Sequence, residues 1–164
     1  MRVPGSVKPV EELFPYRSLR EVLAGRRQRV HSVAPLDTVE RAVRLMARFD
    51  IGLLVVLDGE GLAGVLSERD IVRRAGVADG GNVRDMSVAT LMTRDVATVG
   101  PDERIVRCLE LMDARAARHL PVVEGGRVVA VVSIRDLLHE AVKHHRRIVS
   151  ELDRLRLAAF QPLG

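Results

Sequence analysis

The 164-residue sequence predicts a mixed α/β (α+β) fold made of two copies of one unit, each roughly strand, helix, strand, strand, helix. The first observation is an internal repeat: residues 30–73 align with residues 96–139 without a gap, and 13 of the 44 aligned positions are identical. The second is that the spacing of apolar residues changes within each copy from helical to strand-like. The third is a content of 47% hydrophobic and 29% charged residues, which suffices for an ordinary core. We therefore expect two units that pack with pseudo-twofold symmetry.

Each copy opens with a short extended segment, 30–33 or 96–99, and continues into a helix. Asp37, with Glu40 three positions later, is typical of a capping pair that begins a helix. The apolar positions that follow recur at helical spacing, and they are Val39, Ala42, Val43 and Met46 in the first copy and Ile105, Cys108, Leu109 and Met112 in the second. We expect these residues, including the single cysteine and both methionines, to lie in the core.

A β-hairpin is predicted after each of these helices. Apolar runs at 53–57 and 62–66 flank the turn Asp58-Gly59, and runs at 120–123 and 128–132 flank a second glycine-containing turn. Ser67 and Ser133 stand where the second strand of each hairpin gives way to another helix.

The chain divides into five predicted segments. Residues 1–17 contain three prolines and are expected to be irregular, 18–76 form the first repeat with a lead-in helix, 77–86 form a linker, and 87–142 form the second repeat. Residues 143–164 are predicted to extend the last helix, whose apolar stripe continues past the repeat. Because such a stripe requires cover, it indicates a partner.

Composition excludes several classes of function. Aromatic residues make up only 2% of the chain, which argues against base-stacking surfaces and aromatic cages. The single cysteine cannot form an internal disulfide, and no set of residues has the ligand spacing of a zinc site. No apolar run approaches the roughly 20 residues of a spanning helix, and the N-terminus lacks the pattern of a signal peptide. We expect a soluble, cytoplasmic protein that does not bind membranes.

The pattern Ser-x-Arg-Asp occurs at equivalent places in both copies, and its members are Ser67, Arg69, Asp70, Ser133, Arg135 and Asp136. The N-terminus of a helix favours a phosphate, arginine offers a bidentate fork for it, and aspartate accepts from two adjacent hydroxyls such as those of a ribose. This set of groups suits a nucleotide. The simpler interpretation, that both aspartates only cap their helices, stays open at this point.

With the segments Val-Leu-Ser-Glu-Arg-Asp at 65–70 and Arg-His-Leu-Pro-Val-Val at 118–123, the doubled unit resembles a tandem pair of CBS domains, a Bateman module. The resemblance covers about residues 18–142. Over this length the chain is similar to the small stand-alone CBS-pair proteins of bacteria. It implies two clefts between the repeats, many of which in this family bind AMP, ADP, ATP, NAD or S-adenosylmethionine.

The resemblance also implies roles for single residues. It places ribose-binding carboxylates at Asp70 and Asp136 and the accompanying hydroxyls at Ser67 and Ser133. The opening strands are expected to flank the opposite cleft, Ser32 and Val33 beside Asp136, and Thr98 and Val99 beside Asp70.

The two implied clefts differ at the positions that contact phosphate in relatives. Arg118 and His119, followed by Pro121, match those positions in the second copy, whereas Gly52 and Leu53 are their counterparts in the first. Glu68 adds negative charge beside Asp70, so we expect the Asp136 cleft to be the better site for a charged nucleotide. Ala130 replaces Gly64 and is expected to narrow the approach to the adenosyl group.

The sequence therefore predicts a non-enzymatic regulatory module that binds an adenine nucleotide and acts on an unidentified protein, as a homodimer. No nucleophile–base pair, carboxylate pair or set of metal ligands is visible. One alternative is a structural interaction module without a ligand. Another is a nucleic-acid binder that uses the basic clusters at 26–29 and 143–147, although the interspersed acidic residues and the lack of a DNA-reading motif argue against it.

Overall fold

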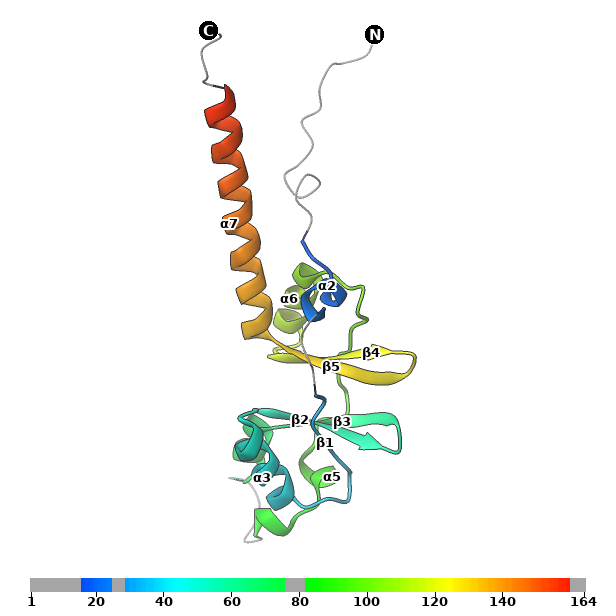
Figure 1. The fold of residues 1–164 in the computed structure, drawn as a ribbon. Helices are drawn as coiled ribbons and strands as arrows, with labels where there is room; N and C mark the ends of the chain where they lie inside the picture. Colours follow the sequence, from blue (N-terminus) through cyan, green and yellow to red (C-terminus); the bar gives the residue numbers. More distant parts are fainter. Residues whose placement is uncertain (1–15, 25–28, 76–81, 160–164) are drawn as a thin grey trace.

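The computed structural model describes residues 16–24, 29–75 and 82–159, and it confirms the mixed helix-and-strand fold (Figure 1). The elements are α2 (Leu19–Leu23), β1 (Ser32–Val33), α3 (Val39–Phe49), β2 (Leu53–Asp58), β3 (Gly61–Ser67), α4 (Glu68–Ala75), the 3-10 helix η1 (Val83–Asp85), α5 (Val88–Leu91), α6 (Ile105–Ala114), β4 (His119–Glu124), β5 (Arg127–Ser133) and α7 (Ile134–Ala159). The predictions for 1–15, 25–28, 76–81 and 160–164, which include the irregular N-terminus and most of the basic cluster at 26–29, lie outside the described residues.

The two sheets differ by one strand. In the first repeat β1 pairs in parallel with β2, which pairs antiparallel with β3. In the second repeat β4 and β5 form the sheet, and the expected strand at 96–99 contributes only a single bridge, Val99 to Val122. Pro121 explains the difference. Its counterpart Val55 donates its N–H to the carbonyl of His31 at 3.2 Å, a hydrogen bond that proline cannot make.

The capping prediction for the first long helix is wrong by one residue. Thr38, not Asp37, is the N-cap of α3, and its hydroxyl accepts from the N–H of Arg41 at 3.2 Å. The Asp37 carboxylate instead accepts from the N–H of Ala34 at 2.8 Å and closes the turn that contains Pro35.

The buried side chains form two clusters, one for each repeat, and each cluster includes a lead-in helix that precedes the other repeat in sequence. Leu19 and Val22 of α2 pack with α6, β4 and β5, whereas Val88 and Leu91 of α5 pack with α3, β2 and β3. Met46, Cys108 and Met112 are buried as predicted, but the prediction is wrong for Val43, which is exposed because it lies at the outer edge of the helix stripe. Burial raises the pKa of the Cys108 thiol to about 11.

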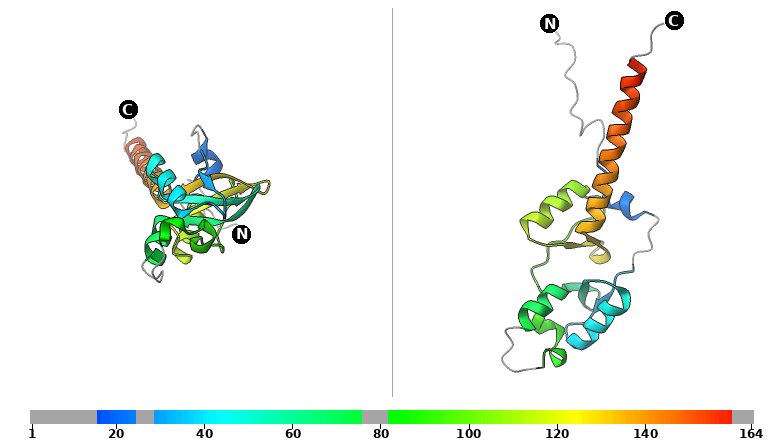
Figure 2. Two further views of the ribbon diagram at one scale, coloured as in Figure 1. Left: turned by 90° about the horizontal axis from the view of Figure 1, so that it is seen from below. Right: turned by 90° about the vertical axis from the view of Figure 1, so that its left-hand side faces the viewer.

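Backbone hydrogen bonds fix this exchange of lead-in helices in a reciprocal way. The N–H of Leu19 donates to the carbonyl of Glu103 at 2.8 Å, and the N–H of Val88 donates to the carbonyl of Asp37, the counterpart of Glu103, also at 2.8 Å. The segment after α5 then crosses to the first sheet, where Thr93 and Val65 exchange two hydrogen bonds of 2.8 and 2.9 Å. The two hairpins consequently lie against each other with the helices on the outer sides (Figures 1 and 2).

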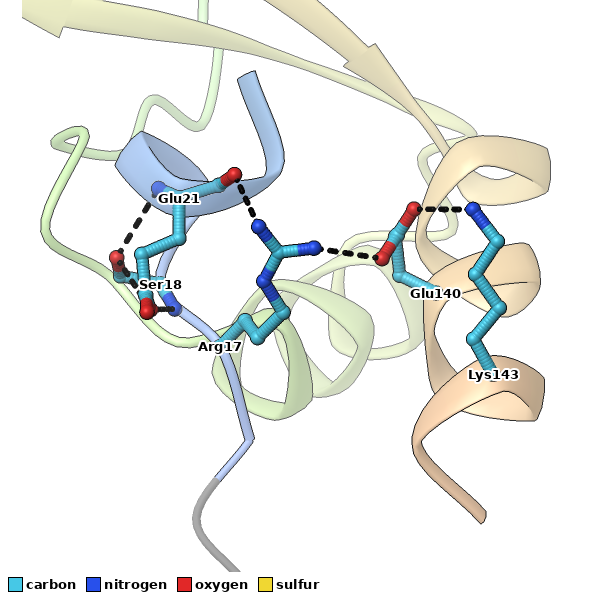
Figure 3. A network of polar contacts seen from close by, with 5 residues as sticks. All are labelled: Arg17, Ser18, Glu21, Glu140 and Lys143. Carbon is cyan, nitrogen blue, oxygen red and sulfur yellow. Dashed lines mark hydrogen bonds and ion pairs between the residues drawn. The ribbon is translucent and has the colours of Figure 1, made fainter. Parts of the chain in front are cut away.

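The last helix, α7, is 26 residues long, or about 39 Å at the usual rise of an α-helix. Its first turns pack on the second repeat, and its later turns extend beyond the rest of the described chain (Figure 2). Arg17 holds α7 against the second repeat, because the Arg17 guanidinium lies 3.4 Å from the carboxylate of Glu140 in that helix (Figure 3). Lys143 contacts the same carboxylate at 3.2 Å. Among the described residues, no helix combines the length and apolarity that crossing a membrane requires.

Gly64 lies where the segment after α5 crosses the first sheet so closely that no side chain fits between them. A Cβ built there would lie 2.5 Å from the carbonyl oxygen of Thr93, so Gly64→Ala must push the paired segments apart. We expect a loss of about 1–3 kcal/mol in the free energy of unfolding, measured by urea denaturation. The matched control is Gly100→Ala, whose Cβ meets nothing within 4 Å. Equal stabilities of the two variants would show that this contact does not constrain the fold.

Candidate functional site

A cavity of about 1050 Å³ lies between the two repeats and is lined by both Ser-x-Arg-Asp motifs. The two motifs, for which the family resemblance implied two clefts, both line this shared space. The residues singled out from the sequence that line it are Gly52, Leu53, Ser67, Arg69, Asp70, Arg118, His119, Ser133, Arg135 and Asp136. The strand-to-helix junctions of both repeats therefore face one shared space.

Five of the expected site residues do not line the cavity. Val33 and Val99 are buried in the cores, Pro121 is a buried residue of β4, and Ser32 and Thr98 are exposed. The cavity is lined instead by the residues just before the opening strands, His31 in the first repeat and Val96 and Ala97 in the second. Once the chain joins the sheet, its valines turn into the core.

Each aspartate of the motif lies in the first turn of its helix and forms a capping box with the serine that precedes the helix. Asp70 accepts at Oδ2 from the N–H of Ser67 at 3.0 Å and from its hydroxyl at 2.6 Å, and the Ser67 hydroxyl accepts from the N–H of Asp70 at 3.2 Å. Ser133 and Asp136 repeat the arrangement with distances of 3.1, 2.6 and 3.2 Å. The capping role that the sequence left open is thus present in both repeats.

Capping does not use up the hydrogen-bonding capacity of these carboxylates. An ionised carboxylate offers about four lone-pair sites on two oxygens, and the capping bonds engage only Oδ2. The second oxygen of Asp70 lies 3.4 Å from the hydroxyl of Thr93, which arrives from the lead-in segment of the second repeat. The cap therefore holds the carboxylate rigidly at the cavity wall, at the positive end of a helix.

Charged groups crowd the cavity wall. Its arginines are Arg29, Arg69, Arg73, Arg115, Arg118 and Arg135, and its carboxylates are Asp50, Glu68, Asp70, Asp95 and Asp136. Arg115 is partly neutralised, because its guanidinium lies 3.1 Å from the carboxylate of Asp95. With this density of arginine forks, the site is suited to a ligand that carries phosphate.

Sequence reasoning missed several lining residues. Thr93 and Asp95 come from the lead-in segment of the second repeat, and Arg115 comes from the end of α6. His31 lines the cavity and stacks on Phe49 with ring centroids 3.9 Å apart. Three of them share a sequence signal, since His31, Thr93 and Asp95 are polar residues at or near the opening extended segments of the two copies.

Glu68 and its counterpart Ile134 give the two halves of the cavity different chemistry. The Glu68 carboxylate lies over Gly52, where a Cβ would come within 3.3 Å of its Oε2 atom. Burial, and secondarily the charge of Arg118, lowers the pKa of His119, while Asp136 and Glu68 oppose this shift. The negative charge of Glu68 therefore affects His119, on the Asp136 side of the cavity, as well as the surroundings of Asp70.

Ala130 does not take the role expected of it. It packs in the core of the second repeat, and neither it nor its counterpart Gly64 lines the cavity, whose wall is formed by the neighbouring Val131 and Val65.

A duplicated unit of this topology, with its strand-to-helix motifs facing a shared cavity, defines a paired-repeat protein. The family model for the CBS domain matches the chain twice, over residues 19–76 and 83–143. The chain therefore belongs to the CBS domain family and contains a pair of these domains.

Individual relatives agree with this assignment. The mitochondrial CBS domain-containing protein CBSX3 of Arabidopsis thaliana is 34% identical over 124 residues, which are 73% of this chain and 58% of that protein. The crystal structure of the CBS domain NE2398 matches with a TM-score of 0.73 at 35% identity and covers 77% of this chain and 98% of its own. A putative signal-transduction protein with CBS domains from Burkholderia ambifaria has the same TM-score at 31% identity, covering 77% and 95%. The chain thus spans little more than half the length of its Arabidopsis relative.

The environment of His119 can be tested by its titration. Because burial disfavours the charged imidazole, we expect an NMR-measured pKa below the usual value of about 6.5, so the stability due to neutral His119 is lost as the pH falls from 6.5 through the folded pKa. Glu68→Gln should lower this pKa further, since it removes a favourable negative charge, and Arg118→Gln should raise it. An unchanged titration in Glu68→Gln would contradict the placement of Glu68 opposite His119.

Proposed function

We propose that this CBS pair is a non-enzymatic regulatory module that binds an adenine nucleotide or related adenosyl ligand, AMP, ADP, ATP or NAD, between its repeats. The observation that carries the proposal is the duplicated Ser-x-Arg-Asp motif at the wall of one cavity of about 1050 Å³. Each copy combines a fixed carboxylate, an arginine and a helix N-terminus. These are the groups that recognise ribose hydroxyls and phosphate.

The half of the cavity around Asp136 is the better site for a charged nucleotide. It contains Arg118 and His119, where the other half has Gly52 and Leu53. It also has Ile134 at the position of Glu68, whose carboxylate would repel a phosphate placed over Gly52. A nucleotide whose ribose hydroxyls bind Asp136 can direct its phosphates toward Arg118.

The same geometry supports a route to a partner. Asp136 lies in the first turn of α7, the helix that extends beyond the described body, so a ligand there contacts the base of that helix. A ligand that binds two arrangements of the repeats unequally shifts their populations. We propose that the module acts in this way on a regulated protein, in the cytoplasm and as a homodimer.

A structural module without a ligand is the second candidate, and the capping bonds of Asp70 and Asp136 are the observation that favours it. Thermal-shift measurements with AMP, ATP, NAD and S-adenosylmethionine separate the two candidates, since only a nucleotide-binding module gains stability from them. The structure argues against the nucleic-acid alternative at the basic cluster 143–147. There Lys143 is paired with Glu140 and His144 is buried, so neither side chain is presented to a nucleic acid.

The role of Asp136 is tested by Asp136→Ala. Hydrogen bonds to charged groups contribute about 1.5–3 kcal/mol, so we expect AMP or ATP affinity to fall roughly ten- to a hundredfold in calorimetry. The variant also removes a helix cap, and Glu21→Ala is its matched control. Glu21 occupies the equivalent place in the capping box of α2, outside the cavity. Unchanged affinity in Asp136→Ala would refute the assignment, as would an equal loss in Glu21→Ala.

Phosphate recognition is tested by Arg118→Ala. We expect ATP to bind roughly tenfold more weakly while adenosine, which has no phosphate, binds as before. Arg127→Ala serves as the control, because Arg127 is an exposed arginine outside the cavity that pairs with Glu60 at 2.6 Å. Equal effects of Arg118→Ala on ATP and adenosine would contradict a phosphate contact.

A further inference from the structure

The outer turns of α7 present an apolar surface that the described chain leaves open. Val149, Leu152 and Leu155 retain 46%, 49% and 58% of their exposure, and Ile148 beside them is half-buried. These four residues, here called the α7 patch, lie where the helix extends beyond the described body (Figures 1 and 2). With 3.6 residues per turn they fall within about 120° of the helix circumference.

The spacing of the α7 patch is that of a two-helix seam. Val149 and Leu152 occupy positions equivalent to a and d of a heptad, and Ile148 and Leu155 occupy successive g positions beside them. On the other flank, the e positions hold Arg146 and Asp153, both exposed. The seam therefore has one apolar flank and one flank with a positive and a negative charge.

We propose that two copies of this chain associate through the α7 patch, with their α7 helices antiparallel about a twofold axis near residues 150–151. In this register Val149 packs against Leu152 of the second copy, and Ile148 packs against its Leu155. The same register places Arg146 opposite Asp153 of the second copy. By symmetry every contact occurs twice, as an isologous interface requires.

A parallel arrangement satisfies fewer of these groups. It would set Arg146 beside Ala141 and Asp153 beside Ile148 of the second copy, so that neither flanking charge meets an opposite charge. The antiparallel arrangement pairs the two flanking charges and places the two bodies at opposite ends of the helix pair. The charge pattern thus selects both the occupant, a second copy, and its direction.

The first half of α7 prepares the second half for this contact. Leu137, Glu140 and His144 are buried against the second repeat, and Arg17 and Lys143 contact Glu140 (Figure 3). The outer turns therefore continue a helix that is already formed, so association does not require helix nucleation. This inference rests on the proposed homodimer and names its interface.

Sedimentation equilibrium of the full chain, without nucleotide, tests the interface. We expect a dimer with a micromolar Kd, and a Kd at least thirtyfold higher for Leu152→Glu with unchanged circular dichroism. The matched control is Leu157→Glu, because Leu157 is more exposed, at 71%, but lies on the opposite side of the helix. Arg146→Asp and Asp153→Arg should each weaken the dimer, and the combined charge reversal should restore it.

Direction is tested by cysteine pairing with copper phenanthroline as the oxidation catalyst. We expect Val149→Cys mixed with Leu152→Cys to form a disulfide-linked dimer, and each variant alone to do so poorly, while the buried Cys108 stays unreacted. Cross-linking of each variant only with itself would overturn the antiparallel arrangement. A dimer that survives Leu152→Glu would overturn the interface and leave the homodimer intact. A monomeric wild-type chain would overturn both.

Discussion

Each repeat completes its core with a helix that precedes the other repeat in the sequence, and the remaining features of the structure depend on this exchange. Leu19 closes the core of the second repeat and Val88 closes that of the first, and both are fully buried. Hydrogen bonds between the backbones of the crossing segments fix the exchange, and the pair between Thr93 and Val65 brings the second lead-in segment to the first sheet. Neither repeat can therefore move away without opening both cores, which keeps the shared cavity in place.

The cavity combines a symmetric scaffold with asymmetric chemistry. The capping boxes of Ser67–Asp70 and Ser133–Asp136 agree within 0.1 Å in all three hydrogen bonds, so the duplicated backbone positions both carboxylates in the same way. The surrounding side chains differ, because Arg118 and Ile134 in one half replace Gly52 and Glu68 in the other. The ligand preference that we propose between the halves rests on this shared scaffold with unequal charge, and Asp136 connects its half of the cavity to α7.

The sequence was sufficient to predict the repeat, the order of its elements and the part of the cavity wall that the duplicated motif forms, because these depend on local periodicity and on a duplicated motif. It could not predict the exchange of the lead-in helices, since an apolar helix such as α2 fits either core and only the long-range bonds of residues 17–20 decide between them. Thr38 rather than Asp37 is the N-cap of α3, because the Asp37 carboxylate accepts a hydrogen bond from the N–H of Ala34 in the preceding turn. Pro121 keeps the segment 96–99 from forming a full strand of the second sheet. This effect could not be predicted from the sequence, because the sequence does not show that this segment pairs beside Pro121.

A crystal structure of the full chain grown with AMP decides whether the duplicated aspartates hold a nucleotide between the repeats. We expect density in the shared cavity, with ribose hydroxyls on Asp136 and the phosphate beside Arg118. AMP bound elsewhere on the surface, or a cavity without nucleotide at a concentration that saturates binding in solution, would contradict it.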